Sequence, residues 1–316
     1  MAKSCVLLLL LSFQLSGCGS GSGSGNSAPV VINSPSPTPT ASATPSATYN
    51  SIANPTGTFD IPLSTVFAGY VGTNVNTALR TEYRGFESTA AKLTISSIGT
   101  YSFAYPAYAQ TFGPSDLNPN RTFLGPAFKT YEKLKLLQAD GSEKNDTLVI
   151  YRPDGGSATP PRAFTYTTVG QAVFKTFSAN LSRSENVGIW FAGGVRTLSS
   201  DVPGSGVQSA TGPATADLSR TIPVDALSGS LSCSTNFATG EARYQIILSS
   251  TSFPSTVLQG NAFLNANRTG FDGTISGGGY NGTISGAFNG PKAGELGVSF
   301  NLNDTSGNSI SGVAAC

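Results

Sequence analysis

The chain has 316 residues, of which 37 are Gly and only 11% are charged, and it contains no histidine. Abundant Gly with few charged residues favours an all-β protein rich in turns over a helical bundle, and the absence of histidine removes the commonest general base and metal ligand. With 18 Lys and Arg residues against 17 Asp and Glu residues, and no basic run, the chain lacks the positive field that nucleic-acid binding requires, so we expect no nucleic-acid partner.

Residues 1–17 have the pattern of a secretory signal peptide, because Lys3 precedes an apolar run at residues 6–11 that is too short to span a bilayer. The end of this segment, Leu-Ser-Gly-Cys18, resembles a bacterial lipobox, which predicts that Cys18 is lipidated and becomes the first mature residue. Gly19 rather than Asp after this cysteine favours the outer membrane. An ordinary signal with Cys18 unmodified is the alternative.

Residues 18–48 are predicted to form a disordered tether. Gly and Ser alternate in residues 19–25, and residues 28–48 are rich in Pro, Ser, Thr and Ala without an apolar period. Such a segment buries too little apolar surface to offset the entropy of ordering it. We expect a reach of roughly 30 Å for about 30 flexible residues, which holds the folded part away from the membrane.

Residues 49–162 predict a small β-rich domain of short strands. A hairpin is expected where residues 133–139 and 147–152 flank a loop that contains Asp140 and Gly141. The acidic residues around this loop lack the spacing of an EF-hand, so we expect a solvated turn and no calcium site.

Aromatic residues are concentrated in residues 101–131 of this domain. An exposed aromatic set provides a large contact area at little entropic cost, and it is a common feature of protein-binding surfaces. The candidate binding surface consists of Tyr105, Tyr108, Phe112 and Phe123. The alternative is a core position, which the spacing of two favours for Tyr101, Phe103 and Tyr105.

Residues 163–316 predict a meandering antiparallel barrel, because short strand patterns alternate with turn residues. The motif Asp-Gly-Thr-Ile-Ser-Gly after Phe271 recurs, with Asn in place of Asp, after Tyr280, which predicts a hairpin with two similar arms. Four glycines on the inward face are expected to let the strands bend at a barrel corner, namely Gly273, Gly277, Gly282 and Gly286.

The four cysteines leave one pair after export. Cys5 is removed with the signal peptide and Cys18 is lipidated, so Cys233 and Cys316 remain in an oxidising compartment. We expect a disulfide that pins the last strand, and two free thiols are the alternative.

No catalytic motif stands out. Residues 277–282 match the spacing G-x-G-x-x-G, but a strand follows them and no helix N-terminus is available for a pyrophosphate. We therefore predict no enzyme, no catalytic residue, no metal site and no cofactor. Hydrolysis based on carboxylates or lysine is the alternative, although no acidic pair is recognisable.

One motif resembles a known family. The pattern Gly286-x-Phe288-x-Gly290-Pro291-x-Ala-x-Glu295-Leu-Gly297 resembles the closing strands of the β-barrel of bacterial transferrin-binding protein B and its relatives. Segments around residues 164–170, 190–197 and 227–231 resemble earlier strands of that barrel in the family's order. The resemblance implies an all-β chain, in which a small β-rich handle at residues 49–162 precedes an eight-stranded antiparallel up-and-down β-barrel at residues 163–316.

The resemblance also implies a function. Family members capture a host protein or an iron source and pass it to a TonB-dependent transporter, so we expect a surface-exposed binding protein, lipid-anchored in the outer membrane. A structural or adhesive envelope lipoprotein without a nutrient ligand is the alternative. Among the usual axial ligands of haem only the 11 Tyr residues remain, so ligation of haem or ferric iron by Tyr stays open while a protein partner is preferred.

Overall fold

The computed structural model describes residues 48–73, 75–84, 91–121, 124–156, 162–179, 184–219 and 225–316. The predicted signal peptide, the predicted lipidation site Cys18 and the predicted tether before Thr48 lie outside these residues. The chain from Ser46 to Cys316 forms one compact unit. Within the residues described, no helix has the length and apolar character needed to cross a membrane.

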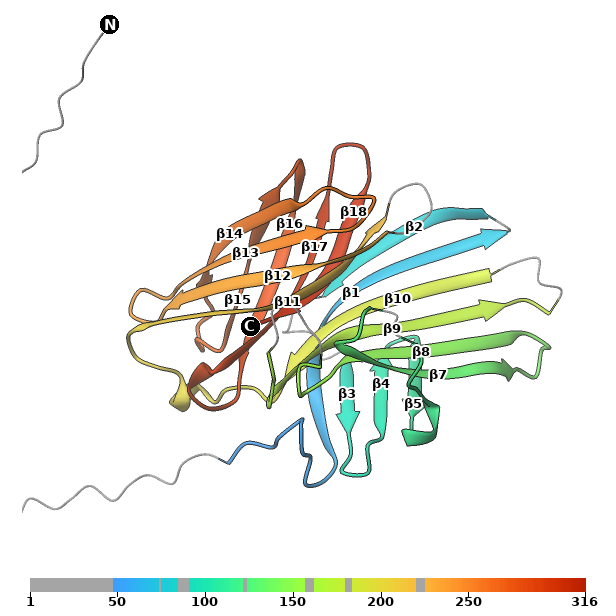
Figure 1. Ribbon diagram of the computed structural model, residues 1–316, viewed down its shortest axis with the longest axis horizontal. Helices are drawn as coiled ribbons and strands as arrows, with labels where there is room; N and C mark the ends of the chain where they lie inside the picture. The colour runs from blue at the N-terminus through green and yellow to red at the C-terminus, as the bar shows by residue number, and fades with distance from the viewer. Residues whose placement is uncertain are drawn as a thin grey trace, which may run out of the picture. The chain divides into compact units, whose positions relative to one another are not determined.

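Ten strands in the first part of the unit form one antiparallel sheet (Figure 1). They are β1 Phe59–Thr73, β2 Val75–Arg84, β3 Lys92–Ile95, β4 Tyr101–Tyr105, β5 Tyr108–Phe112, β6 Leu117–Asn118, β7 Phe128–Leu137, β8 Glu143–Tyr151, β9 Thr167–Phe177 and β10 Ser184–Gly194. The order is β5-β4-β3-β1-β10-β9-β8-β7-β6. The long strand β1 pairs with β10 on one edge and with β3 and then β2 on the other.

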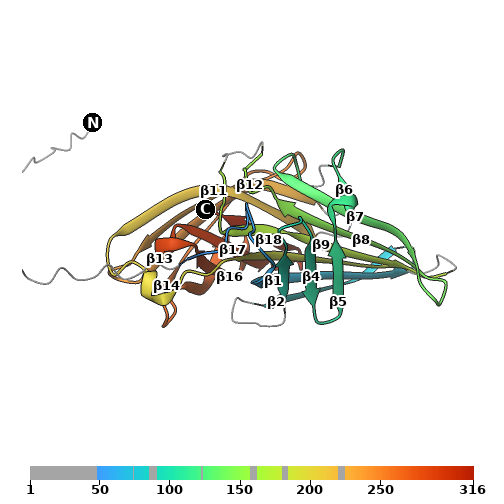
Figure 2. The ribbon, with the colours of Figure 1, turned by 90° about the horizontal axis from the view of Figure 1, so that it is seen from below.

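The sheet curls into a half-barrel around its own apolar core. Phe103 of β4 lies 6.0 Å from Phe174 of β9 and 5.5 Å from Phe191 of β10, measured between ring centroids. The short strands β3–β5 therefore fold back over one face of the long strands (Figure 2). The expected hairpin is confirmed as β7 and β8, with a register shift between Lys133 and Leu136.

Eight further strands form a closed barrel in chain order. They are β11 Val207–Ser219, β12 Asp225–Asn236, β13 Glu241–Ser249, β14 Thr256–Leu264, β15 Gly270–Gly277, β16 Tyr280–Asn289, β17 Glu295–Asn303 and β18 Ser309–Ala315. Every neighbour pair is antiparallel, and β18 closes the barrel against β11. The predicted all-β fold with an eight-stranded up-and-down barrel is confirmed. Three 3-10 turns complete the described elements, η1 Pro114–Asp116, η2 Ser199–Asp201 and η3 Pro291–Ala293.

The first barrel strand begins later than residue 163. We expected β9 and β10 to belong to the barrel, but both edges of β9 are occupied by β8 and β10, so no edge is left for a barrel neighbour. The segment from residue 164 to residue 197 therefore belongs to the curled sheet and to its connection with the barrel. The division into a handle at residues 49–162 and a barrel domain at residues 163–316 stays a prediction.

The repeated motif forms the predicted hairpin, in which Gly277 of β15 is opposite Tyr280 of β16. Its glycines make room for neighbours. A Cβ at Gly273 would lie 2.6 Å from the Tyr244 Oη, and one at Gly286 would lie 2.5 Å from the Phe271 ring. Side chains larger than hydrogen at these positions would displace the aromatic pair that packs inside the barrel.

The second face of the curled sheet packs on the outside of the barrel. Val66, Val169 and Trp190 of the sheet form one buried cluster with Ala287 and Val313 of the barrel. Because one face of β9 meets this cluster and the other faces the core of the half-barrel, its residues 167–174 are buried without alternation. The expected disulfide is confirmed, since Cys233 of β12 is bonded to Cys316.

Candidate functional site

The interior of the barrel is filled by its own side chains. Leu218, Ile246 and Phe300 are fully buried there, and Tyr244 stacks on Phe271 with 5.5 Å between the ring centroids. Packed interiors of this kind hold few voids larger than a water molecule. A ligand site is therefore sought on the outside of the barrel.

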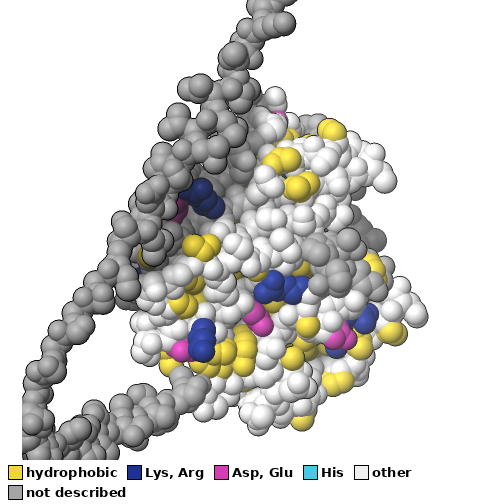
Figure 3. Space-filling model, turned by 60° about the vertical axis from the view of Figure 1, so that its left-hand side comes forward, with side chains coloured by type: hydrophobic (Ala, Val, Ile, Leu, Met, Phe, Trp, Pro, Cys, Tyr) yellow, Lys and Arg dark blue, Asp and Glu magenta, His cyan; other side chains and the backbone are white. Residues whose placement is uncertain are grey.

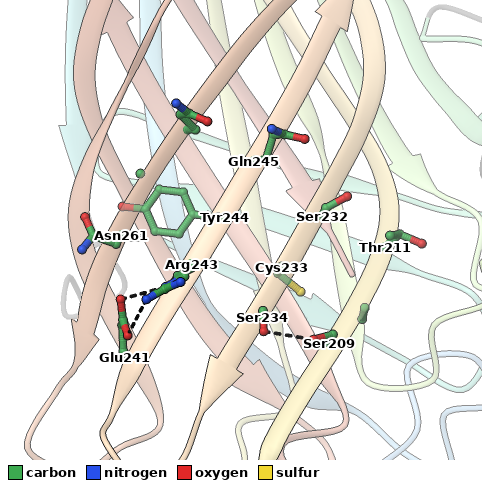
Figure 4. Close-up of a pocket in the computed structure, with 13 residues that line it drawn as sticks. Ser209, Thr211, Ser232, Cys233, Ser234, Glu241, Arg243, Tyr244, Gln245 and Asn261 are labelled. Carbon is green, nitrogen blue, oxygen red and sulfur yellow. Dashed lines mark hydrogen bonds and ion pairs between the residues drawn. The ribbon is translucent and has the colours of Figure 1, made fainter. Parts of the chain in front are cut away.

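A hollow of about 900 Å³ lies on the outer face of β11–β14 (Figure 4). Strand alternation directs its lining side chains outward, because their sequence neighbours Ala210, Cys233 and Tyr244 pack against the interior core. The outward residues are Ser209 and Thr211 of β11, Ser232 and Ser234 of β12, Glu241, Arg243 and Gln245 of β13, and Gln259 and Asn261 of β14. The hydroxyl side chains of β11 and β12 extend less far from the barrel surface than the longer side chains of β13 and β14. This difference makes the surface concave.

The hollow is polar and close to neutral. The Nε and Nη2 of Arg243 donate to the two carboxylate oxygens of Glu241 at 2.8 and 3.2 Å, and these hydrogen bonds raise the pKa of Arg243. The Ser209 hydroxyl donates to Ser234 at 3.0 Å. Figure 3 likewise shows a surface with few charged side chains on the face that it presents. Such a hollow is suited to an uncharged polar partner.

Exposed apolar side chains stand at both ends of the hollow. Val207 and Phe263 are 66% and 68% exposed at one end, and Ile247 and Val257 are 37% and 44% exposed at the other. Ile247 pairs with Val257, and Glu241 pairs with Phe263, so six residues of β13 separate the two ends by about 20 Å. We call the hollow together with these four apolar residues the barrel face.

The aromatic residues proposed from the sequence do not form this surface. Tyr105 and Phe112 are only 7% and 0% exposed, because β4 and β5 fold over the core of the half-barrel. Tyr108 is half-buried and donates to the Glu185 carboxylate at 2.9 Å; burial, with a contribution from Glu185, raises its pKa to about 12. Phe123 lies outside the described residues. Tyr105 and Phe112 are therefore core residues, and the candidate binding surface is corrected by their removal.

The family motif forms a structural joint at one end of the barrel. The carboxylate of Glu295 accepts the backbone N–H groups of Thr165 and Tyr166 at 2.8 and 3.0 Å. Gly290 has a φ of 71°, and a Cβ there would lie 2.2 Å from the Tyr166 ring. These contacts hold the chain that leads into β9 against the barrel.

The remaining motif residues divide between this joint and the barrel interior. Pro291 begins η3, and a Cβ at Gly297 would lie 3.1 Å from Thr167, the first residue of β9. Phe288 instead packs on Phe237 inside the barrel, with ring centroids 5.6 Å apart. Glu295, Gly290 and Gly297 therefore serve the attachment of the two sheets.

The segment that follows the predicted tether docks at this joint. The Tyr49 hydroxyl donates to Asp201 at 2.9 Å and accepts the Leu198 N–H at 3.1 Å, and the backbone N–H of Lys292 donates to the same Asp201 oxygen at 3.1 Å. Burial raises the pKa of Tyr49. We did not anticipate this contact; the only sequence signal is that Tyr49 is the first aromatic residue after the tether.

A buried carboxyl joins the barrel to the curled sheet. Asp217 of β11 accepts hydrogen bonds from Gln171 Nε2 at 2.8 Å and Trp190 Nε1 at 3.2 Å. Burial raises the pKa of Asp217 to about 6, more than the two hydrogen bonds lower it. The sequence showed only a single acid among small and apolar residues. Within the described part of the chain, no group of three His, Cys, Asp or Glu residues is placed to hold a metal ion.

No family model matches the chain, and neither does any curated protein. Solved structures do align with it. A mutant of transferrin-binding protein B from Haemophilus parasuis Hp5 is 13% identical, with a TM-score of 0.45, over 80% of this chain and 44% of that chain. HpuA from Kingella denitrificans, solved in complex with human haemoglobin, is 15% identical, with a TM-score of 0.39, over 86% of this chain and 95% of that chain.

A further neighbour is transferrin-binding protein B from serogroup B Neisseria meningitidis, 10% identical with a TM-score of 0.32, over 83% of this chain and 76% of that chain. The chain thus spans less than half of the Haemophilus parasuis protein and nearly all of HpuA. The neighbours in structure include the family that the motif from Gly286 to Gly297 resembles. What those proteins bind does not follow for this chain from such distant likenesses.

Proposed function

We propose that the chain is a lipid-anchored binding protein of the outer membrane, which captures a protein ligand at the barrel face for a TonB-dependent transporter. The observation that carries the proposal is the barrel face itself, an open polar hollow with exposed apolar side chains at both ends, on a barrel whose interior is filled. Catalysis has no part in this proposal.

The shape of the barrel face favours a macromolecule over a small molecule. Sites for small molecules enclose most of the ligand surface and are largely apolar, whereas this hollow is open and lined by hydroxyl, amide and paired charged groups. Protein interfaces combine a few aromatic or Arg anchors with polar surroundings. Phe263 and Arg243 are the side chains of the barrel face that match those anchors.

The proposals of a membrane anchor and of a nutrient ligand rest on the sequence. The lipobox pattern at Cys18 and the predicted tether support attachment to the outer membrane, and Tyr49, near the start of the described residues, is hydrogen-bonded to Asp201. Transferrin and haemoglobin are the first ligands to test, since the neighbours in structure carry the names of a transferrin-binding protein and a haemoglobin receptor. The competing hypothesis is that the ligand is haem, bound through Tyr.

The test is a binding titration with the full-length chain in detergent. We expect saturable binding of human transferrin or haemoglobin, with a Kd at least tenfold weaker for Phe263→Ser or Arg243→Ala, because truncation of an anchor side chain at a hot spot costs about 2 kcal/mol or more. The matched control is Leu137→Ser, which changes a side chain that is 77% exposed at the end of β7, in the curled sheet. Its Kd should equal that of the wild type.

Two results would count against the proposal. A stoichiometric Soret shift with haemin at sub-micromolar concentration would indicate that the ligand is haem and not a protein. No saturable binding of either protein, with intact attachment to the membrane, would favour a structural or adhesive lipoprotein.

A further inference from the structure

The outward side chains of the barrel face form a regular grid. Strands β11–β14 pair in register, so outward residues of neighbouring strands stand side by side, about 5 Å apart across the strands and about 7 Å apart along them. The rows of the grid are Val207, Asn236, Glu241 and Phe263; then Ser209, Ser234, Arg243 and Asn261; then Thr211, Ser232, Gln245 and Gln259. Side chains that form hydrogen bonds therefore occupy every position of the second and third rows.

Three amide side chains of this grid are available to a ligand. Gln245, Gln259 and Asn261 are exposed, and within the described part of the chain their side chains make no hydrogen bond. Gln245 is directly opposite Gln259, and Asn261 stands beside both of them in the next row (Figure 4). Because each amide has two donors and one acceptor oxygen, the three together offer both kinds of group at one place.

The charged residues of the hollow neutralise each other. Among the described residues that line it, only Glu241 and Arg243 carry a charge. The Nε and Nη2 of Arg243 are bonded to Glu241, which leaves Nη1 as a donor. Recognition of phosphate or nucleic acid relies on positive charge that is not compensated. The hollow therefore favours a polar ligand without charge.

The backbone beneath the hollow is not available to a peptide strand. Both edges of β12 and of β13 are paired with neighbouring strands. A ligand over these strands is therefore recognised through hydroxyl, amide and guanidinium groups alone. Such groups match a ligand that carries many hydroxyls, since each hydroxyl both donates and accepts.

An aromatic ring completes the surface. Phe263 is 68% exposed and lies two residues from Asn261 on β14. The face of an aromatic ring is negative and attracts groups with a partial positive charge. The C–H groups on one face of a pyranose ring are of this kind, whereas its hydroxyls project around the edge. A sugar is thus complementary both to the ring and to the polar rows beside it.

We propose that the hollow of the barrel face binds a neutral oligosaccharide, which the protein ligand carries as a covalently attached glycan. Gln245, Gln259 and Asn261 bind the sugar hydroxyls, and Phe263 packs on the C–H face of one sugar ring. The volume of about 900 Å³ lies near the upper end of the range for ligand sites, roughly 300–1,000 Å³, which suits several linked sugars. Since the hollow is open to solvent, the rest of the glycoprotein stays outside it.

This inference rests on the proposed function, because it names the chemical group by which the protein ligand is held at the same surface. The alternative outcome is that the protein ligand contacts the barrel face through amino-acid side chains.

The experiment uses the full-length chain in a detergent without a sugar headgroup and two probes. The first probe is an array of neutral oligosaccharides of the kinds that occur on glycoproteins, and each one bound is then titrated in solution. The second is human transferrin in two forms, one with its sialic acids removed, so that its glycans are neutral, and one with its glycans removed entirely.

The variants differ in position and not in chemistry. Asn261→Leu and Gln245→Leu each remove an amide from the hollow and keep a side chain of similar size. Asn281→Leu is the matched control, because Asn281 is an exposed amide of β16 that does not line the hollow.

We expect saturable binding of at least one oligosaccharide, with similar Kd for the wild type and Asn281→Leu. The Kd should be at least tenfold weaker for Asn261→Leu and Gln245→Leu. Transferrin without glycans should bind at least tenfold more weakly than the form with neutral glycans. The inference is overturned if no oligosaccharide binds, or if Asn261→Leu and Gln245→Leu bind the oligosaccharide as tightly as the wild type does.

Failure of this inference is distinguishable from failure of the proposed function. Equal binding of the two forms of transferrin, weakened by Phe263→Ser, would overturn the glycan and leave the proposed function standing. Binding of an oligosaccharide that depends on Asn261, without binding of transferrin or haemoglobin, would support the sugar site and count against capture of those proteins.

Discussion

Replacement of Asp217 by Asn tests how the barrel is held to the curled sheet. Burial raises the pKa of Asp217 from 3.8 to about 6 in the folded protein. The folded state therefore binds the proton more tightly than the unfolded state does. Stability from this group is greatest below pH 4, declines as the pH rises from about 4 to about 6, and is constant above that.

The magnitude follows from the two pKa values. The difference between 3.8 and about 6 corresponds to a cost of about 3 kcal/mol at neutral pH, of which about 2 kcal/mol develops between pH 4 and pH 7. These are upper figures, because Asp217 keeps a partly exposed edge. Gln171 Oε1 is buried without a hydrogen-bond partner, and a flip of this amide would let it accept from the protonated carboxyl.

The assay is urea unfolding from pH 4 to pH 7, followed by the fluorescence of Trp190, which is the single Trp and donates to Asp217. Asp217→Asn cannot ionise, so the unfolding free energy of the wild type should fall relative to that of the variant by about 2 kcal/mol as the pH rises. Asp272→Asn, at an exposed position of β15, is the control and should follow the wild type. Parallel curves for the wild type and Asp217→Asn would refute the assignment.

Three further predictions concern other contacts. Replacement of Cys233 and Cys316 by Ala opens a loop of 83 residues and should destabilise the protein by about 4 kcal/mol, a fall in Tm of about 8 °C in calorimetry without reductant; two thiols that titrate in the native protein would contradict it. Glu295→Gln should cost about 1–3 kcal/mol in urea unfolding, because one backbone N–H at residues 165–166 loses its acceptor. Glu241→Gln, at a side chain that is 26% exposed and paired with the largely exposed Arg243, should cost less than about 1 kcal/mol, and an equal loss of stability in both variants would show that the joint at Glu295 contributes nothing. Cys18→Ala should release the protein from membranes, which fractionation after a salt wash measures, and continued association with the outer membrane would show that the anchor lies elsewhere.

Local patterns were sufficient to predict much of the fold. Gly273 and Gly286 were predicted to face the interior and lie there beside Tyr244 and Phe271, because the direction of side chains in a strand depends only on the residue's parity. The repeat around Phe271 and Tyr280 predicted a hairpin, since a tight turn joins neighbours in the sequence. The count of cysteines after export predicted the bond between Cys233 and Cys316.

Positions that depend on distant strands were not predictable in this way. Residues 167–177 match a strand, but only the presence of β8 and β10 on its two edges places it in the curled sheet. Phe112 was assigned to a binding surface, and its burial results from the folding of β4 and β5 over the half-barrel. Tyr105 is buried as well, in agreement with the core alternative that its spacing of two favours. Aromatic residues serve both roles, so their type alone does not distinguish an interface from a core.

The sequence by itself determined the all-β class, the presence of a meandering antiparallel barrel, the hairpin around Phe271 and Tyr280 and the disulfide, because these depend on turn residues, a short repeat or a count. The number of eight strands was implied by the family resemblance. Only the tertiary structure decided the barrel face and the buried Asp217. The hollow requires short side chains on β11 and β12 beside long ones on β13 and β14. The pKa of Asp217 is raised because the curled sheet buries its carboxyl, although the hydrogen bonds from Trp190 and Gln171, 27 and 46 residues earlier in the chain, lower it.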